Sequence, residues 1–174
     1  MSKPSRPSDP DRACGHPRTF FVTTSTAAGR PILQTERMAE LLIDVLRSCM
    51  RESSFNIHEF VVMPNHVHVL MTIPGGLTVE KAMQLIKGRF SFRARKELGF
   101  PGEVWQRGFS DVRITDEASF RQHRLYIEQN PIKAALARTA DEYPFGSAHL
   151  KKLKRTGAKA QSSTAVIGTT EVVP

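Results

Sequence analysis

The 174-residue chain contains only two cysteines, Cys14 and Cys49, which lie far apart and lack the C-x-x-C spacing of thiolate metal sites. This scarcity argues against a disulfide framework and against a zinc site built on cysteine. No apolar run approaches the roughly 20 residues of a membrane helix, and the N-terminal segment lacks the apolar stretch of a signal peptide. We therefore expect a cytoplasmic protein that does not span a membrane.

Acidic residues are outnumbered: 17 Asp and Glu face 25 Lys and Arg, for a net charge of +8 and a pI near 9.9. Such a balance points to a polyanionic partner. Residues 81–96 hold six basic side chains and no acidic one, although a solvated helix face would look the same. The single Trp105 is interpreted as a local core anchor. The length predicts one domain over 18–149, between a Pro-rich disordered leader (1–17) and a flexible basic tail (150–174).

Hydrophobic periodicity and turn residues predict alternating strands and helices. Thr35 and Thr78 are expected N-caps, and Pro64-Asn65 is expected to form the turn of an antiparallel hairpin. The expected strands cover 18–26, 56–63, 66–73 and 111–115, and the expected helices cover 36–52, 79–99, 116–129 and 132–139. Asn130-Pro131 is expected to close the third helix.

Two histidines, His66 and His68, stand two residues apart in the second strand of the hairpin. Residues i and i+2 of a strand project to the same face, so both imidazoles can bind one divalent cation. The turn just before His66 places the pair near a strand end, where a ligand has access. A pair of partly buried histidines satisfied by hydrogen bonds remains an alternative.

A metal bound by two histidines needs further ligands, and the helix expected over 116–129 carries candidates for them. Tyr126 and Asn130 are four residues apart and share a polar face with Gln122 and His123. These polar neighbours of Tyr126 indicate a role beyond packing, although a tyrosine on the surface can also have no function. The other tyrosine, Tyr143, precedes a proline outside any helical pattern and is expected to pack.

Four segments in order, VVMPNHVHVL, LIKGRFSFRARKELG, VWQRGFSD and YIEQNPIKAAL, resemble the REP-associated type of single-tyrosine HUH transposases. The resemblance spans roughly 18–149. It implies a ferredoxin-like α+β domain with an antiparallel sheet, active as a homodimer on single-stranded DNA hairpins. It also implies that His66 and His68 bind Mg²⁺ or Mn²⁺ with Asn130 as third protein ligand, and that Tyr126 is the nucleophile.

These roles predict a DNA endonuclease and strand transferase that works through a 5′-phosphotyrosine link. A phenol ionises near pH 10, so it needs help to attack a phosphodiester, and a divalent cation polarises the phosphate. The covalent link conserves bond energy, so ATP is not required. Five basic side chains are candidates for DNA backbone contacts: Lys87, Arg89, Arg93, Arg95 and Lys96. A non-catalytic hairpin-binding protein and a phosphodiesterase with a water nucleophile are the alternatives.

Overall fold

A computed structural model of the chain describes residues 15–53 and 55–164, with side chains as far as residue 157. Most of the expected leader, residues 1–14, lies outside this range, as do residues 165–174 of the expected tail. Two short 3-10 turns, η2 (Ala27–Gly29) and η3 (Ile32–Gln34), follow the first strand. The main elements are β1 (Arg18–Ser25), α1 (Glu36–Glu52), β2 (Asn56–Met63), β3 (His66–Ile73), α2 (Val79–Leu98), β4 (Ser110–Ile114), α3 (Glu117–Lys133) and α4 (Ser147–Thr164).

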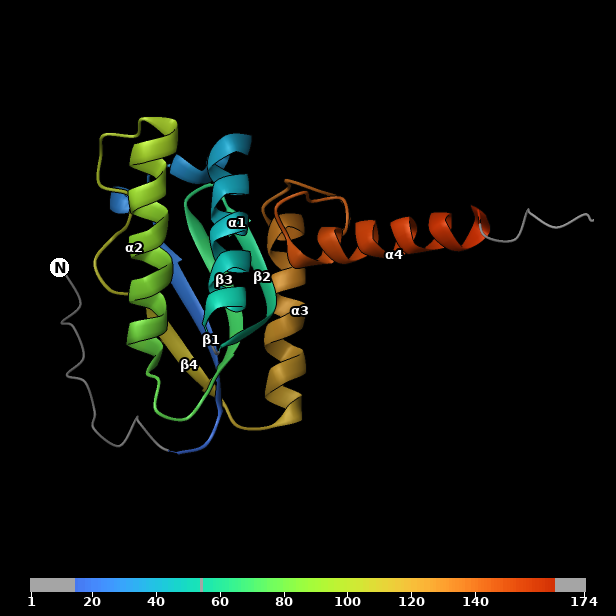
Figure 1. The fold of residues 1–174 in the computed structure, drawn as a ribbon, viewed down its shortest axis with the longest axis horizontal. Coiled ribbons are helices and arrows are strands. Elements are labelled where there is room, and N and C mark those ends of the chain that lie inside the picture. The colour runs from blue at the N-terminus through green and yellow to red at the C-terminus, as the bar shows by residue number, and fades with distance from the viewer. Residues whose placement is uncertain (1–14, 54, 165–174) are drawn as a thin grey trace, which may run out of the picture.

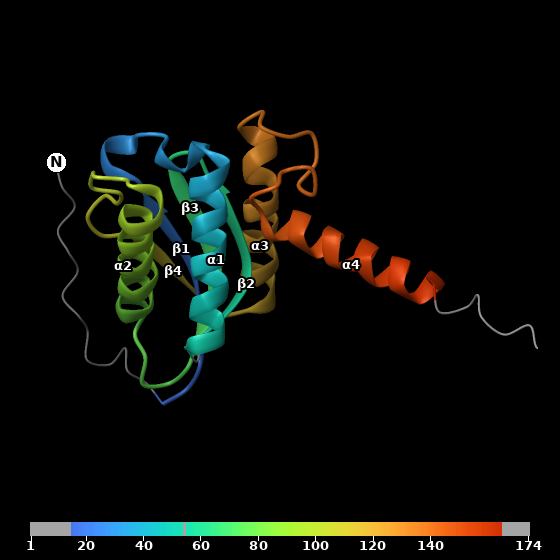
Figure 2. The same ribbon diagram turned by 45° about the horizontal axis from the view of Figure 1, so that its top comes forward.

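The four strands form one antiparallel sheet in the order β2-β3-β1-β4. With α1 between β1 and β2, and α2 between β3 and β4, the chain follows the β-α-β-β-α-β path of ferredoxin-like domains. Helices α1 and α2 cover one face of the sheet and α3 covers the other (Figure 1; Figure 2). The expected α+β fold is therefore confirmed, and β3 occupies a central position in it.

Alternation along the strands divides the sheet into two faces. Val67 and Val69 of β3 join the larger core under α1 and α2, whereas Leu70 joins a smaller cluster with Ile127 of α3. Because side chains alternate along a strand, His66 and His68 lie on the same side as Leu70 and face α3. The sheet therefore presents both histidines to the helix that was expected to complete their site.

Local signals at the element ends explain why the elements start where they do. Thr35 and Thr78 cap α1 and α2, accepting hydrogen bonds from backbone N–H groups at 3.4 and 3.2 Å, as expected. Asp116 caps α3 in the same way, at 2.8 Å from the amide of Ser119. The turn at Pro64-Asn65 joins β2 to β3 as expected. Among the described residues, no helix is both long enough and apolar enough to cross a membrane.

Helix α3 was expected to close before Pro131 but runs on to Lys133, so that boundary was wrong. A proline inside a helix removes one hydrogen bond to the preceding turn and crowds the carbonyl there, and α3 continues for only two residues beyond Pro131. Ala135, with a φ of 55°, then turns the chain out of the helix. The separate helix expected over 132–139 was also wrong, because the chain leaves α3 after Lys133 and continues through turns and bends.

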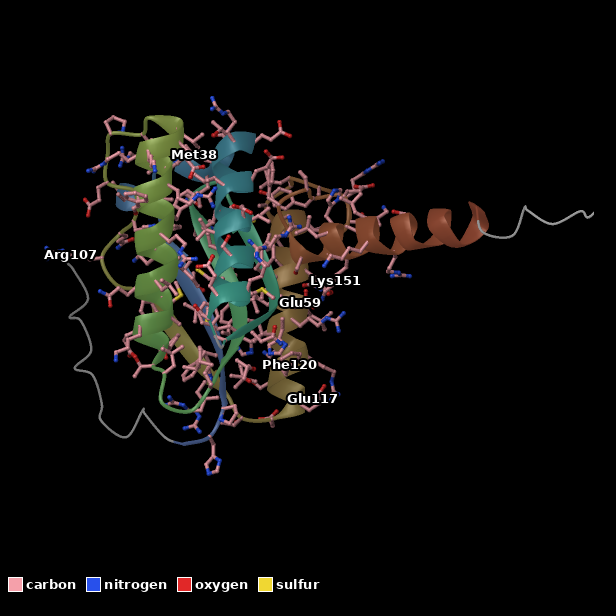
Figure 3. The ribbon with its side chains drawn as sticks, in the orientation of Figure 1. Met38, Glu59, Arg107, Glu117, Phe120 and Lys151 are labelled. Carbon is pink, nitrogen blue, oxygen red and sulfur yellow. The ribbon has the colours of Figure 1, made fainter. Side chains whose placement is uncertain are left out.

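The segment expected to be a flexible tail, 150–174, overlaps α4 as far as Thr164. α4 starts against the body of the protein, where the Ser147 hydroxyl donates to the buried Glu59 carboxylate at 2.6 Å and Lys151 pairs with the same group. Figure 3 shows Glu59 and Lys151 side by side at the root of α4. Farther along, α4 extends away from the body (Figure 1), and its side chains over 151–157 are exposed. These contacts to Glu59 were not visible in the sequence because they join positions about 90 residues apart.

Candidate active site

The histidine pair lies at the start of β3, on the face of the sheet covered by α3. His68 stands opposite Thr23 of β1 in the strand register, and His66 stands opposite Ser25. The centroids of the two imidazole rings are 4.7 Å apart. This spacing lets both rings reach one small cation, as the sequence predicted from the i, i+2 relationship.

Burial keeps both imidazoles neutral. Only 5% of His68 is exposed, and burial, reinforced by the nearby His66, lowers the pKa of His68 to about 3. Burial also lowers the pKa of His66, although a hydrogen bond with the Asn130 side chain opposes the shift. A neutral imidazole has a free lone pair on one nitrogen, which is the form that binds metals. The pair is therefore in its ligating state at neutral pH.

Tyr126 and Asn130 bring α3 onto the histidines. The ring of Tyr126 lies edge-on to His68, with centroids 5.2 Å apart, and the side chain of Asn130 hydrogen-bonds with His66. Phe21 of β1 lies beneath this group, with centroid distances of 5.4 Å to His68 and 5.7 Å to Tyr126. The four residues singled out in the sequence thus meet in one place, although they come from segments some 60 residues apart.

Tyr126 is open to a substrate. Its side chain is 43% exposed, in contrast to Tyr143, which is buried and donates a hydrogen bond to the carbonyl of Val62 at 2.8 Å. The ammonium of Lys133 lies 5.6 Å from the centre of the Tyr126 ring, seven residues further along α3. An accessible phenol ring with a positive charge nearby can present its hydroxyl to a phosphate. Tyr143 is instead a packing residue, as expected.

Each histidine is held by a hydrogen bond at its Nδ1 atom. Nδ1 of His68 lies 2.8 Å from Oγ1 of Thr23, and Nδ1 of His66 lies 2.7 Å from Oδ1 of Asn65. These contacts engage the ring nitrogen nearer the backbone. They leave Nε2, at the tip of each ring, as the nitrogen for a ligand.

The donor set can hold a divalent cation that keeps open coordination positions. Within residues 15–53 and 55–164, no three His, Cys, Asp or Glu side chains gather into a metal cluster. Asn130 is the candidate third donor, through its amide oxygen. Two imidazoles and one amide leave several positions for phosphate oxygens and water, which is what an ion acting on a phosphodiester needs. The residues present therefore fit a divalent cation.

The five basic candidates on α2 lie on the opposite face of the sheet from the histidines (Figure 2). Three of them are occupied within the fold. Lys87 donates to the carbonyls of Gln106 and Gly108, Arg89 pairs with Glu52, and Arg93 pairs with Asp44 and Glu97. Arg95 and Lys96 are exposed at the end of α2.

Three further residues of the site escaped the sequence analysis. Thr23 and Phe21 lie on β1, and only the pairing of β1 with β3, which a single sequence does not specify, brings them beside His68. Lys133 carried a readable signal, because positions seven apart share a helix face. The expectation that α3 ends before Pro131 removed Lys133 from that helix.

The fold and the comparisons with known proteins identify a transposase. The chain belongs to the IS200-like transposase family, whose model matches residues 20–130. It is 26% identical over 132 residues to the REP-associated tyrosine transposase of Escherichia coli strain K12, covering 75% of this chain and 76% of that protein. It is also similar to a solved structure of a REP-associated tyrosine transposase bound to a REP hairpin, with a TM-score of 0.67, 25% identity and coverage of 86% and 84% of the two chains. The resemblance found in the sequence is thereby confirmed.

Proposed function

We propose that this transposase is a metal-dependent endonuclease and strand transferase that cleaves single-stranded DNA at hairpin or palindromic repeats. The observation that carries the proposal is the meeting of Tyr126 with His68 and of Asn130 with His66 on one face of the sheet. In this assignment Tyr126 is the nucleophile, and His66, His68 and Asn130 hold Mg²⁺ or Mn²⁺.

The chemistry follows from the positions of these side chains. A bound divalent cation would draw negative charge from the scissile phosphate. The Tyr126 oxygen attacks phosphorus in line and loses its proton to solvent, which reaches the exposed side of the ring. The bond between phosphorus and the 3′-oxygen breaks, and that oxygen takes up a proton. The products are a 5′-phosphotyrosyl link and a free 3′-OH, and attack by another 3′-OH reverses the chemistry to join strands.

Lys133 supports this role for Tyr126. Its ammonium lies 5.6 Å from the centre of the Tyr126 ring, so a phosphate brought to the Tyr126 hydroxyl would also come near this charge. Attraction to the phosphate would hold the strand against Tyr126 during the attack. The positive charge of Lys133 thus lies near the side chain that would attack the phosphate.

A DNA hairpin is the substrate class that the comparisons favour, since the similar solved structure is bound to a REP hairpin. The excess of basic residues supports a polyanionic partner. Arg95 and Lys96 remain candidates for backbone contacts; because α2 covers the far face, they would meet DNA that flanks the cleaved strand. Lys154 and Arg155, exposed on the projecting α4, are further candidates.

We also propose a homodimer, as the family resemblance implies. Leu125 and Ile132 are 53% and 39% exposed, and their spacing of seven residues places them on one side of α3. Apolar side chains exposed in this way supply contact area for a second copy. Sedimentation velocity should show a dimer for the wild type and a monomer for the Leu125→Lys, Ile132→Lys variant; a monomeric wild type would refute this part of the proposal. The candidate residues of the active site all come from one chain, so cleavage by a monomer would leave the catalytic assignment intact.

A covalent adduct tests the proposed reaction. The protein is incubated with labelled single-stranded hairpins and Mg²⁺ or Mn²⁺, and the products are separated under denaturing conditions. We expect a protein-DNA species that resists denaturation in the wild type and is absent in Tyr126→Phe, while hairpin binding is retained. Tyr143→Phe is the matched control, since it removes the same hydroxyl from the other tyrosine of the chain.

Two outcomes would replace the proposal with its alternatives. Cleavage that survives Tyr126→Phe without an adduct would indicate a water nucleophile. Hairpin binding without cleavage, across a panel of palindromic sequences and both cations, would indicate a DNA-binding protein that no longer cuts. If Tyr143→Phe also lost the adduct with its fold intact, the assignment of Tyr126 as the nucleophile would no longer follow from the loss of the adduct in Tyr126→Phe.

A further inference from the structure

The two candidate metal ligands are each anchored by a neighbouring oxygen. Thr23 lies directly across from His68 in the β1–β3 register, and its Oγ1 is 2.8 Å from Nδ1 of that ring. Asn65, the last residue of the hairpin turn, places Oδ1 2.7 Å from Nδ1 of His66. In both rings the contact is made at Nδ1. The partner of His68 lies on the neighbouring strand, and the partner of His66 is the preceding residue.

The chemistry of the partner atoms decides where the ring protons lie. An amide Oδ1 can only accept, so Nδ1 of His66 must carry the proton, and its Nε2 then holds the lone pair. A threonine hydroxyl can either accept or donate, so Thr23 is compatible with both tautomers of His68. Metal binding at Nε2 requires the tautomer with the proton on Nδ1, which Thr23 stabilises as an acceptor.

We propose that Thr23 is the positioning residue that fixes the ring orientation and tautomer of His68 for metal binding, and that Asn65 does the same for His66. This inference rests on the proposed function, because it assigns partners to the metal ligands named there. Neither residue touches the reacting atoms. Their effect passes through the histidines.

Burial makes Thr23 the more important of the two. His68 is only 5% exposed, so water has little access to replace a lost hydroxyl at its Nδ1. His66 is half-buried and Asn65 is exposed, so water can take the place of the Asn65 oxygen. Removal of Thr23 Oγ1 therefore leaves a buried ring nitrogen without its partner, whereas removal of Asn65 Oδ1 does not.

The chain supplies a matched control on the same strand. Thr19 lies four residues before Thr23 on the same face of β1, and its hydroxyl is 2.7 Å from that of Thr72 on β3. Thr19→Val and Thr23→Val thus each remove one cross-strand hydrogen bond between side chains. Only the second loses a partner of a candidate metal ligand.

The test measures Mn²⁺ binding directly, from the electron paramagnetic resonance signal of the free ion, without DNA. We expect Thr23→Val to weaken Mn²⁺ binding about 10- to 100-fold, the usual effect of removing an oxygen that supports a metal-bound histidine. Thr23→Ser should restore binding, Thr19→Val should leave it unchanged, and Asn65→Ala should weaken it less than Thr23→Val. Equal thermal unfolding midpoints for Thr19→Val and Thr23→Val would show that stability does not explain the difference.

A second readout does not depend on metal. The ¹⁵N chemical shifts of the His68 ring distinguish the two neutral tautomers, and we expect the Nδ1-protonated form in the wild type and a mixture in Thr23→Val. Wild-type affinity for Mn²⁺ in Thr23→Val would overturn the inference and leave the proposed function standing. If the wild type instead binds Mn²⁺ no better than a His66→Ala, His68→Ala variant, the metal site itself fails and the inference fails with it.

Discussion

Acid should destabilise this protein through His68, and the size of the effect follows from its burial. The pKa of His68 falls from 6.5 to about 3 in the folded protein because burial penalises the charged ring. Between pH 6.5 and about 3, His68 is protonated in the unfolded chain but stays neutral in the folded protein. The stabilisation from this group is therefore complete above pH 6.5 and is lost as the pH falls towards 3.

Between pH 7 and pH 5 the loss amounts to about 2 kcal/mol, since each pH unit below 6.5 costs about 1.4 kcal/mol for one group. The perturbation that isolates it is His68→Asn, which keeps a polar side chain that does not titrate. Urea unfolding in the presence of a chelator, followed by fluorescence of Trp105, gives the free energy of unfolding at each pH. Trp105 suits this purpose because it is the only tryptophan and is buried beside Phe90.

We expect the wild type to lose about 2 kcal/mol more than His68→Asn between pH 7 and pH 5. Burial also lowers the pKa values of His58 and His66, so the variant should retain some sensitivity to acid. The reasoning is refuted if the two proteins lose stability in parallel over this range. In that case His68 would accept its proton in the folded state without penalty, and its burial would not hold it neutral.

Three other predictions concern the elements around the site. Glu59→Gln should lower the free energy of unfolding by about 2 kcal/mol, because Lys151 and Ser147 lose a charged acceptor. The same variant should speed amide hydrogen exchange at the base of α4, and unchanged exchange would contradict the anchoring role of Glu59. Lys154→Gln with Arg155→Gln should reduce the salt slope of hairpin binding by about 1.4 to 1.8 while adduct formation at saturating DNA persists, and an unchanged slope would show that α4 does not contact DNA. Tyr143→Phe should cost about 1 kcal/mol in urea unfolding, because a buried backbone carbonyl of β2 loses its donor, and a neutral result would mean that water replaces the hydroxyl.

Local patterns in the sequence were sufficient for most of the fold and for the pairing of chemical groups within each element. Alternation placed His66 and His68 on one face, and helical spacing placed Tyr126 and Asn130 on another. What joined the two faces was the family resemblance, because periodicity says nothing about which helix covers which side of a sheet. The residues missed at the site, such as Thr23, depend on strand register and lie outside the reach of local pattern.

Errors at the C-terminal end have a different cause. Pro131 favours a helix end when it is judged alone, but a helix near its last turn tolerates the loss of one hydrogen bond. The stretch after residue 150 shows no amphipathic period because α4 packs only through its first turns, where Ser147 and Lys151 meet Glu59. A helix that is held only at one end, by polar contacts, has no hydrophobic periodicity from which it could be predicted.

In the proposed assignment, the position of Tyr126 and Asn130 on one helix links attack to metal binding. Four residues of α-helix span about 6 Å, so the phenol and the amide are one turn apart on a rigid rod. Any movement of α3 away from the sheet would then withdraw the proposed nucleophile and one proposed ligand of the cation at the same time. If α3 shifts when the tyrosine is released from DNA, the cation would thus be bound less tightly as well. Another DNA strand that entered the site at that moment would meet neither the tyrosine nor a fully held cation.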